Sequence, residues 1–300
     1  RHLFFEIDRL TPPVAETLGR LRNLRMLSIK QTGDLQRDSD TRLSHDCLLA
    51  VGRMSGLEDL SLEHMVMGSE SFKCLAGLTN LKSLQLHSIY PDLDDQTIDT
   101  SPPMLGQLPP LPGLETLIFT LSWVGDRDLQ HLAVLPRLKT LSLWGTKVTD
   151  AGLRELAAID SLEELAIDDK MATVAGLQSL LVVERLNILH IDGKSSWYTS
   201  QPLATLDVDR GDEILVPARE LDGYHRAVRA LRSSNAGIVI DRGAMSLGYI
   251  SQYELPWTYE NRANHRSSSW PPIKDMPWLS PPLRGQIETD AAREGVTTSF

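Results

Sequence analysis

The fold is decided by residues 140–168, TLSLWGTKVTDAGLRELAAIDSLEELAID. Apolar residues alternate with other residues in Leu141–Leu143 and again in Leu165–Ile167, which is the pattern of a short strand with one buried face. Between these two stretches, apolar residues recur every three positions from Leu153 to Ile159, as they do along the buried side of a helical turn. The segment therefore predicts a strand, a helical turn and a second strand.

The same unit recurs along most of the chain. Leu141, Leu165 and Leu189 begin three successive copies that are 24 residues apart. Earlier copies place the same apolar position at Leu3 (in a truncated leading repeat), Leu27, Leu60, Leu84 and Leu117. The spacing is 33 residues instead of 24 from Leu27 to Leu60 and from Leu84 to Leu117. Because the apolar positions before each strand stay in frame, the extra residues are placed at Gly33–Arg42 and at roughly Ile89–Asp99. One repeat cannot bury its apolar face alone, so the repeats are expected to stack around a continuous core.

This pattern resembles the leucine-rich-repeat family, from about Leu3 to Ile240. The closest subtype is written T-D-x-G-L, here Thr149-Asp150-Ala151-Gly152-Leu153, and resembles repeats of bacterial proteins and of the recognition arms of F-box proteins. The resemblance implies an α/β solenoid: a curved parallel sheet on the concave face, with helices or helical turns on the convex face. It also implies a binding scaffold rather than an enzyme. The usual Asn at the third residue after each Leu-x-Leu is absent, for example at Thr146, so an irregular ladder of side chains is expected there.

The repeat pattern weakens after residue 191. We interpret Ile214–Val216 and Ile238–Ile240 as two irregular terminal strands, joined by a helix over Leu221–Leu231. The solenoid then covers residues 1–241, and residues 242–300 form an aromatic, proline-rich segment. This segment is interpreted as a cap over the end of the core, or alternatively as an arm that docks a partner or another subunit. The final residues, from about Glu288, are expected to be loose.

Composition narrows the classes of partner. The 300 residues carry a formal charge of −10 with a pI near 5.3, which argues against nucleic acid and against anionic membranes. The two cysteines, Cys47 and Cys74, fit no zinc pattern and are expected to be buried thiols. No cofactor is indicated, and the protein is expected to be a monomer. The sequence begins at Arg1 rather than Met, so the compartment stays open, with the cytoplasm favoured.

The concave side of such a sheet is the natural binding surface. Trp144 is expected to point out from it among polar and acidic groups, the composition of an interaction hot spot. We assign ligand binding to Trp144, Ile118, Asp168, His190, Asp192, Glu164 and His87, with the carboxylates selecting basic side chains. The alternative is that Trp144 packs along its own sheet or under a loop.

Other functions find less support in the sequence. Asp92-x-Asp94-Asp95 in the second insertion resembles a calcium loop but lacks the full spacing, so a solvated loop is favoured. Residues 244–248, AMSLG, resemble a nucleophile elbow without a matching Asp and His, and no phosphate-binding or metal motif occurs. The alternative functions are a structural spacer, a substrate-recruitment arm of a larger assembly, and a carbohydrate or small-ligand module using Trp144.

Overall fold

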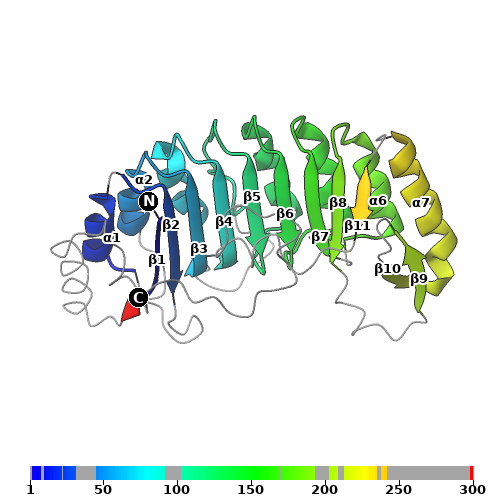
Figure 1. Cartoon of the computed structure of the whole chain (residues 1–300), viewed down its shortest axis with the longest axis horizontal. Coiled ribbons are helices and arrows are strands. Elements are labelled where there is room, and N and C mark those ends of the chain that lie inside the picture. The colour runs from blue at the N-terminus through cyan, green and yellow to red at the C-terminus, as the bar shows by residue number, and fades with distance from the viewer. Residues whose placement is uncertain are drawn as a thin grey trace.

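A computed structural model provides the fold. It describes residues 2–7, 10–21, 23–31, 45–91, 103–168, 171–192, 203–208, 213–234, 238–241 and 298–299. In this part of the chain, one ten-stranded sheet runs in the order β11-β8-β7-β6-β5-β4-β3-β2-β1-β12. All neighbours in it are parallel except β12 on β1. The strands lie side by side along the long axis, with helices on one side of them (Figure 1).

The strand bounds follow the Leu-x-Leu motifs. They are β1 (His2–Ile7), β2 (Met26–Gln31), β3 (Asp59–Val66), β4 (Ser83–Tyr90), β5 (Thr116–Thr120), β6 (Thr140–Trp144), β7 (Glu164–Asp168), β8 (Ile188–Asp192), β11 (Val239–Asp241) and β12 (Thr298–Ser299). The pairing aligns Leu84, Leu117, Leu141 and Leu165 across four neighbouring strands. The repeat frame deduced from the sequence is therefore the strand register.

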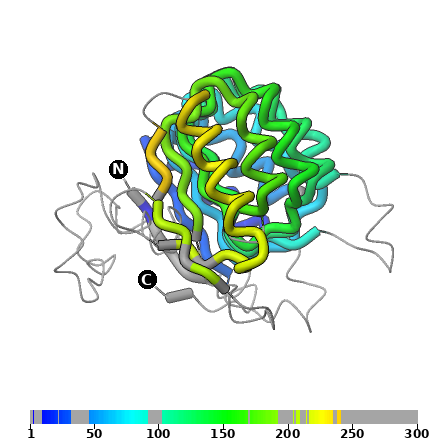
Figure 2. Tube along the Cα trace, turned by 90° about the vertical axis from the view of Figure 1, so that its right-hand side faces the viewer, coloured from blue at the N-terminus to red at the C-terminus, as the bar shows by residue number. Residues whose placement is uncertain are grey.

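Short helices make up the convex side. The α-helices are α1 (Pro12–Gly19), α2 (His45–Gly52), α3 (Ser69–Lys73), α4 (Asp126–Leu129), α5 (Asp150–Leu153), α6 (Val174–Ser179) and α7 (Leu221–Ser234). The 3-10 helices are η2 (Cys74–Gly77), η3 (Gln130–Val134), η4 (Arg154–Ala158), η5 (Leu180–Val182) and η8 (Ala218–Glu220). The three-residue apolar spacing matches the three residues per turn of a 3-10 helix, which keeps one side chain per turn on the core. Viewed along the long axis, successive repeats lie one behind another (Figure 2).

A single apolar core joins strands and helices. Leu86, Phe119 and Leu143 are paired neighbours on β4, β5 and β6 and are fully buried. The same cluster of buried residues extends from Leu3 to Ile240. The fold is thus the expected leucine-rich-repeat solenoid. Both cysteines are buried thiols that form no disulfide, as predicted, and burial raises the pKa of the Cys74 thiol.

The carboxyl-terminal end differs from the expectation in two ways. Ile214 lies in β10 (Glu213–Pro217), which pairs antiparallel with β9 (Leu203–Asp207) in a separate sheet. The place beside β8 is taken by β11, the second of the two expected strands. A hairpin partner satisfies the backbone of β10 as well as the main sheet would. The helix between them is present as α7, as predicted.

The chain terminus also departs from the expectation. Thr298 and Ser299, in the segment expected to be loose, form β12 and pair antiparallel with β1. The second insertion was placed too early, since β4 continues through Ile89 and Tyr90 and pairs with β3 there. Among the described residues, no helix is long and apolar enough to cross a membrane.

Candidate functional site

The concave face consists of the strand residues that alternate with the buried leucines. The central ladder runs in register across β2 to β8 as Ser28, Ser61, Gln85, Ile118, Ser142, Ala166 and His190. The ladder before it runs as Met26, Asp59, Ser83, Thr116, Thr140, Glu164 and Ile188. The ladder after it runs as Lys30, Glu63, His87, Thr120 and Trp144, and Asp168 pairs with Asp192 beyond a break. The predicted composition of the face is thus confirmed, apart from the break.

These three ladders are acidic. Five of their residues are carboxylic acids, and Lys30 is the one basic residue among the ladder members just named. Lys30 is already paired, since its Nζ lies 3.7 Å from Oε1 of Glu63. The charge surplus therefore favours a ligand that brings positive charge to the face.

Three of the seven assigned residues are less accessible than expected. Ile118 is 2% exposed, His87 3% and Asp168 4%. The expectation that the whole set lines an accessible surface is therefore wrong for these three residues.

Asp168 has an internal contact that the sequence did not reveal. The pairing of β6 with β7 ends at Ser142 and Ala166. Beyond that point the backbone N–H of Gly145 donates to Oδ2 of Asp168 at 3.2 Å. Trp144 and Asp168 therefore do not continue one ladder, because the chain turns at Gly145, whose φ is +68°. The Asp168 carboxylate holds this turn rather than an open position for a ligand.

Trp144, Glu164 and His190 remain partly exposed. Glu164 accepts from the Thr140 hydroxyl at 3.1 Å, and its Oε1 lies 2.9 Å from Nε2 of His190. The side chains of Glu164 and His190 are 24% and 18% exposed. Trp144 is half-buried at the end of β6. Asp192 is placed in β8 opposite Asp168, and this strand position is all that is described of it. Among the assigned residues whose side chains the structure describes, the accessible ones are Trp144, Glu164 and His190.

One backbone feature at the carboxyl end of the strands was missed from the sequence. His64, Ser88, Leu121 and Gly145 occupy the same place in successive repeats, and all have positive φ, from +52° to +68°. Only Gly145 is a residue that adopts this conformation without strain. Leu121 is also 48% exposed, and it lies beside Trp144 because its N–H donates to the Trp144 carbonyl at 3.0 Å. Aligning the repeats on Gly145 would have located this turn.

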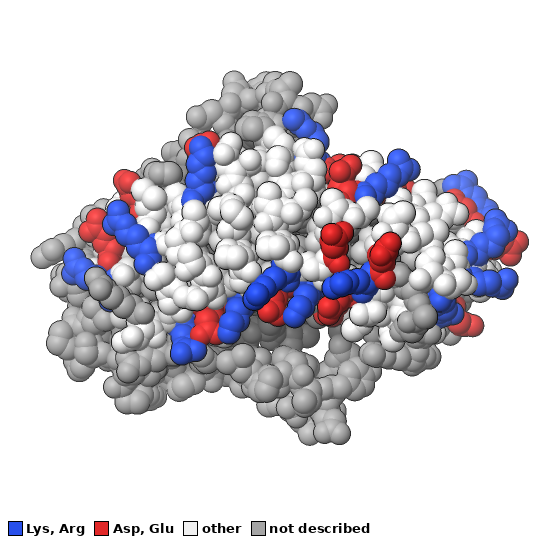
Figure 3. Space-filling model, turned by 90° about the horizontal axis from the view of Figure 1, so that it is seen from above, with Lys and Arg blue, Asp and Glu red and all other residues white. Residues whose placement is uncertain are grey.

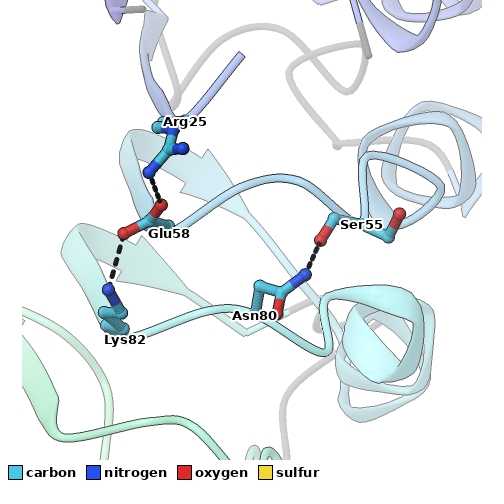
Figure 4. Close-up of polar contacts among 5 residues, drawn as sticks. All are labelled: Arg25, Ser55, Glu58, Asn80 and Lys82. Atoms are coloured by element: carbon cyan, nitrogen blue, oxygen red, sulfur yellow. Dashed lines mark hydrogen bonds and ion pairs between the residues drawn. The ribbon is translucent and has the colours of Figure 1, made fainter. Parts of the chain in front are cut away.

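A second missed feature is a row of charges immediately before the strands. We call Arg25, Glu58, Lys82, Glu115, Lys139 and Glu163 the alternating row, because basic and acidic residues follow one another in it. Glu58 pairs with Arg25 and, at 2.7 Å, with Lys82 (Figure 4). Lys82 lowers the pKa of Glu58 most, chiefly by its hydrogen bond. Viewed from above, a line of basic and acidic side chains follows the long axis (Figure 3).

The alternating row has no net charge, and several of its side chains form ion pairs with one another. Each of its carbonyls accepts from the next repeat, as Arg25 does from the N–H groups of Glu58 and Asp59 at 2.7 and 2.9 Å. Asn80 adds a bond to the Ser55 carbonyl at 2.8 Å (Figure 4). Exposed pairs of this kind contribute little stability. We therefore regard this row as part of the repeat frame and not of the candidate site.

His87 makes folding stability depend on pH. Burial, and to a smaller extent the charge of His64, lowers the pKa of His87 to about 4, whereas an unfolded chain has a histidine pKa of about 6.5. The unfolded state therefore binds the proton first. This contribution to stability is complete above about pH 6.5 and is lost as the pH falls toward 4.

We expect about 2 kcal/mol of this contribution to be lost between about pH 8 and pH 5. Urea unfolding of wild type and His87→Gln at both pH values measures the effect. The difference between the two proteins should shift in favour of His87→Gln at the lower pH. An equal pH dependence in the two proteins would contradict the account.

Several interpretations fall outside the described residues. They are the acidic parts of both insertions, the AMSLG segment at 244–248 and the aromatic stretch Tyr249–Trp278. Within the described ranges, no group of three or more His, Cys, Asp and Glu side chains is arranged to hold a metal ion.

Comparison with solved structures finds other repeat proteins. An internalin from Listeria monocytogenes is 21% identical, with 59% of this chain and 56% of that chain covered and a TM-score of 0.34. A leucine-rich-repeat protein from Leptospira interrogans is 16% identical, with 59% and 52% covered and a TM-score of 0.31. A plant peptide hormone receptor in complex with RGF2 is 12% identical, with 64% and 42% covered and a TM-score of 0.26. The chain thus spans about half the length of the first two. No protein-family model and no curated protein sequence matches it.

Proposed function

We propose that this chain is a non-enzymatic scaffold that binds a protein or peptide ligand on its concave face. The observation that carries the proposal is Trp144, a half-buried tryptophan at the end of β6 on a strand-built face that carries a surplus of carboxylates. An aromatic side chain of this kind supplies most of the binding energy at many interfaces. The exposed Leu121 beside it extends the apolar contact.

Glu164 is the carboxylate best suited to select a basic ligand. Thr140 and His190 fix its position, yet its side chain stays 24% exposed. Asp168 is less suited to this role because its carboxylate accepts a hydrogen bond from the Gly145 N–H at the turn after β6. Trp144 and Glu164 lie on adjacent strands, four residues apart in register, which corresponds to about 14 Å along and across the sheet. A ligand of four or more extended residues would reach both.

We further propose that residues 1–241 form this scaffold and that its repeats belong to the T-D-x-G-L subtype. The core cluster extending to Ile240 supports the boundary. The subtype is supported by contacts between repeats. Thr149 donates to Asp126 through both its N–H and its hydroxyl at 2.6 Å, and the Thr173 hydroxyl donates to Asp150 at 2.7 Å. The link to F-box recognition arms stays a prediction from the motif alone.

The test is selection of binders from a displayed library of linear random-sequence peptides, followed by affinity measurement on variants. Trp144→Ala should weaken a selected peptide by about thirtyfold, corresponding to roughly 2 kcal/mol for a hot-spot residue. Val182→Ala is the matched control, because Val182 is 57% exposed in η5 on the convex side. Circular dichroism establishes that both variants are folded.

If no selected peptide depends on Trp144, the concave-face proposal is wrong. A structural spacer would then be the better interpretation. Equal losses in Trp144→Ala and Val182→Ala would also count against it, because they would indicate a general effect on the fold.

A further inference from the structure

Three buried polar atoms on neighbouring strands of the concave face have no hydrogen-bond partner among the residues that the structure describes. They are Nδ1 of His87 on β4, Oγ1 of Thr120 on β5 and Oγ of Ser142 on β6. None has a hydrogen bond within the described part of the chain. The residues are 3%, 2% and 1% exposed. We call these three residues the polar row.

The polar row is compact. His87 and Thr120 are directly paired, and Thr120 is paired with Trp144, two residues beyond Ser142. All three side chains lie on the concave face, because the residues that alternate with them, such as Phe119, face the core. Neighbouring strands are about 4.8 Å apart, so the polar row spans about 12 Å diagonally, which an extended segment of about four residues covers.

Unpartnered buried groups are rare in native proteins because each forfeits its hydrogen bonds to water. Two further hydroxyls without a partner, those of Thr11 and Ser28, lie in the amino-terminal repeats. The remaining three lie on three consecutive strands, and Thr120 and Ser142 are the two nearest to Trp144. Their clustering beside the half-exposed tryptophan is the observation that indicates a ligand.

We propose that the polar row receives the main-chain amide groups of an extended peptide. The inference rests on the proposed concave-face function and adds the conformation of the ligand. An extended chain presents free N–H and C=O groups, whereas a helix uses its own internally. A helical ligand would therefore leave the polar row unsatisfied.

The hydrogen-bonding capacities match a peptide group. Nε2 of His87 lies 3.4 Å from Oε1 of Gln85, and with the proton on Nε2 the Nδ1 atom is an acceptor for a ligand N–H. The hydroxyls of Thr120 and Ser142 donate to a ligand carbonyl. Gln85 and Trp144, which are both partly exposed, lie next to the polar row. Binding requires the side chains around the polar row to change rotamer, a change that is common at interfaces.

The Glu164 carboxylate indicates the charge of the peptide's side chains. Glu164 on β7 lies one strand beyond Ser142 and two residues earlier in register, so a peptide that runs diagonally from His87 on β4 to Glu164 spans about 20 Å, or roughly six extended residues. A lysine or arginine at the β7 end meets the Glu164 carboxylate, and an apolar residue about four positions earlier in the peptide meets Trp144. The inferred ligand is a short, basic, extended segment of a protein.

The test removes the hydroxyls without removing volume. Thr120→Val/Ser142→Ala should weaken a library-selected linear peptide about tenfold, the cost of one to two hydrogen bonds. The unfolding midpoint of the free protein should stay unchanged or rise, because unpartnered hydroxyls are lost. Ser28→Ala, which removes a similarly unpartnered hydroxyl on β2, should change neither quantity. Methylating the peptide nitrogens one at a time should weaken binding at one position, and by a similar factor in wild type and in the double variant, because the double variant keeps His87 as the acceptor of the ligand N–H.

The outcomes separate this inference from the proposed function. If Trp144→Ala loses the peptide while Thr120→Val/Ser142→Ala binds as wild type does, the amide inference is wrong and the proposed function stands. If neither variant loses it, or no linear peptide is selected, both are wrong. A double variant that loses stability together with affinity would assign the hydroxyls to the fold and overturn the inference.

Discussion

Phe119→Ala is expected to lower the free energy of unfolding by about 3–5 kcal/mol. Phe119 is fully buried on β5, between Leu86 on β4 and Leu143 on β6. Strand pairing on both sides holds the backbone in place, so the cavity left by the ring cannot close fully. Urea unfolding followed by circular dichroism gives the value.

The position of Phe119 increases the consequence of the loss. Each repeat of a solenoid contacts only its neighbours, so weakening one central interface loosens the coupling between the two halves. A broader transition than in wild type is expected for this reason. Leu121→Ala is the control, because Leu121 is two residues away and 48% exposed. A loss below about 1 kcal/mol for Phe119→Ala would show that the site repacks.

Gly52→Ala is expected to cost about 3 kcal/mol. Gly52 ends α2, and a Cβ there would lie 1.9 Å from the carbonyl oxygen of Cys74 in the next repeat. The obstacle is backbone rather than a flexible side chain. The backbones are close on both sides of this contact, since a Cβ added to Gly77 in the next repeat would lie 2.2 Å from the carbonyl oxygen of Gly52. The methyl group must therefore push two repeats apart.

Gly125→Ala provides the matched control for the same substitution. A Cβ on Gly125 would lie 4.0 Å from Cβ of Lys147, and its φ of −127° suits alanine. Gly125→Ala should change the unfolding midpoint little, while Gly52→Ala lowers it clearly. Equal midpoints for the two variants would mean that the contact between Gly52 and Cys74 is relieved without cost.

Much of the fold was predictable because the repeat specifies its own register. Leu141 and Leu165 are equivalent positions, and stacking equivalent positions buries each apolar face against the next. The ladder order of the concave face followed from the alternation in the strands. The helix before Ile238 was predictable from the spacing of its apolar residues, such as Tyr224 and Leu231. These features depend on local periodicity, which a sequence displays directly.

Accessibility was not predictable, because it depends on neighbours from other repeats. Alternation places Ile118 and Trp144 on the same face, yet Ile118 is buried and Trp144 is half-exposed. The sequence also gives no sign that the Asp168 carboxylate accepts from the Gly145 N–H in the preceding repeat.

The sequence by itself determined the solenoid, its repeat length, its strand register and the residues of the concave face. Only the tertiary structure decided that β10 leaves the main sheet and that β12 joins it. It also decided which concave residues are open to a ligand and where unpartnered polar atoms gather. The physical reason is that apolar periodicity fixes which face of an element is buried, whereas hydrogen-bond partners and exposure depend on groups that are distant in the chain.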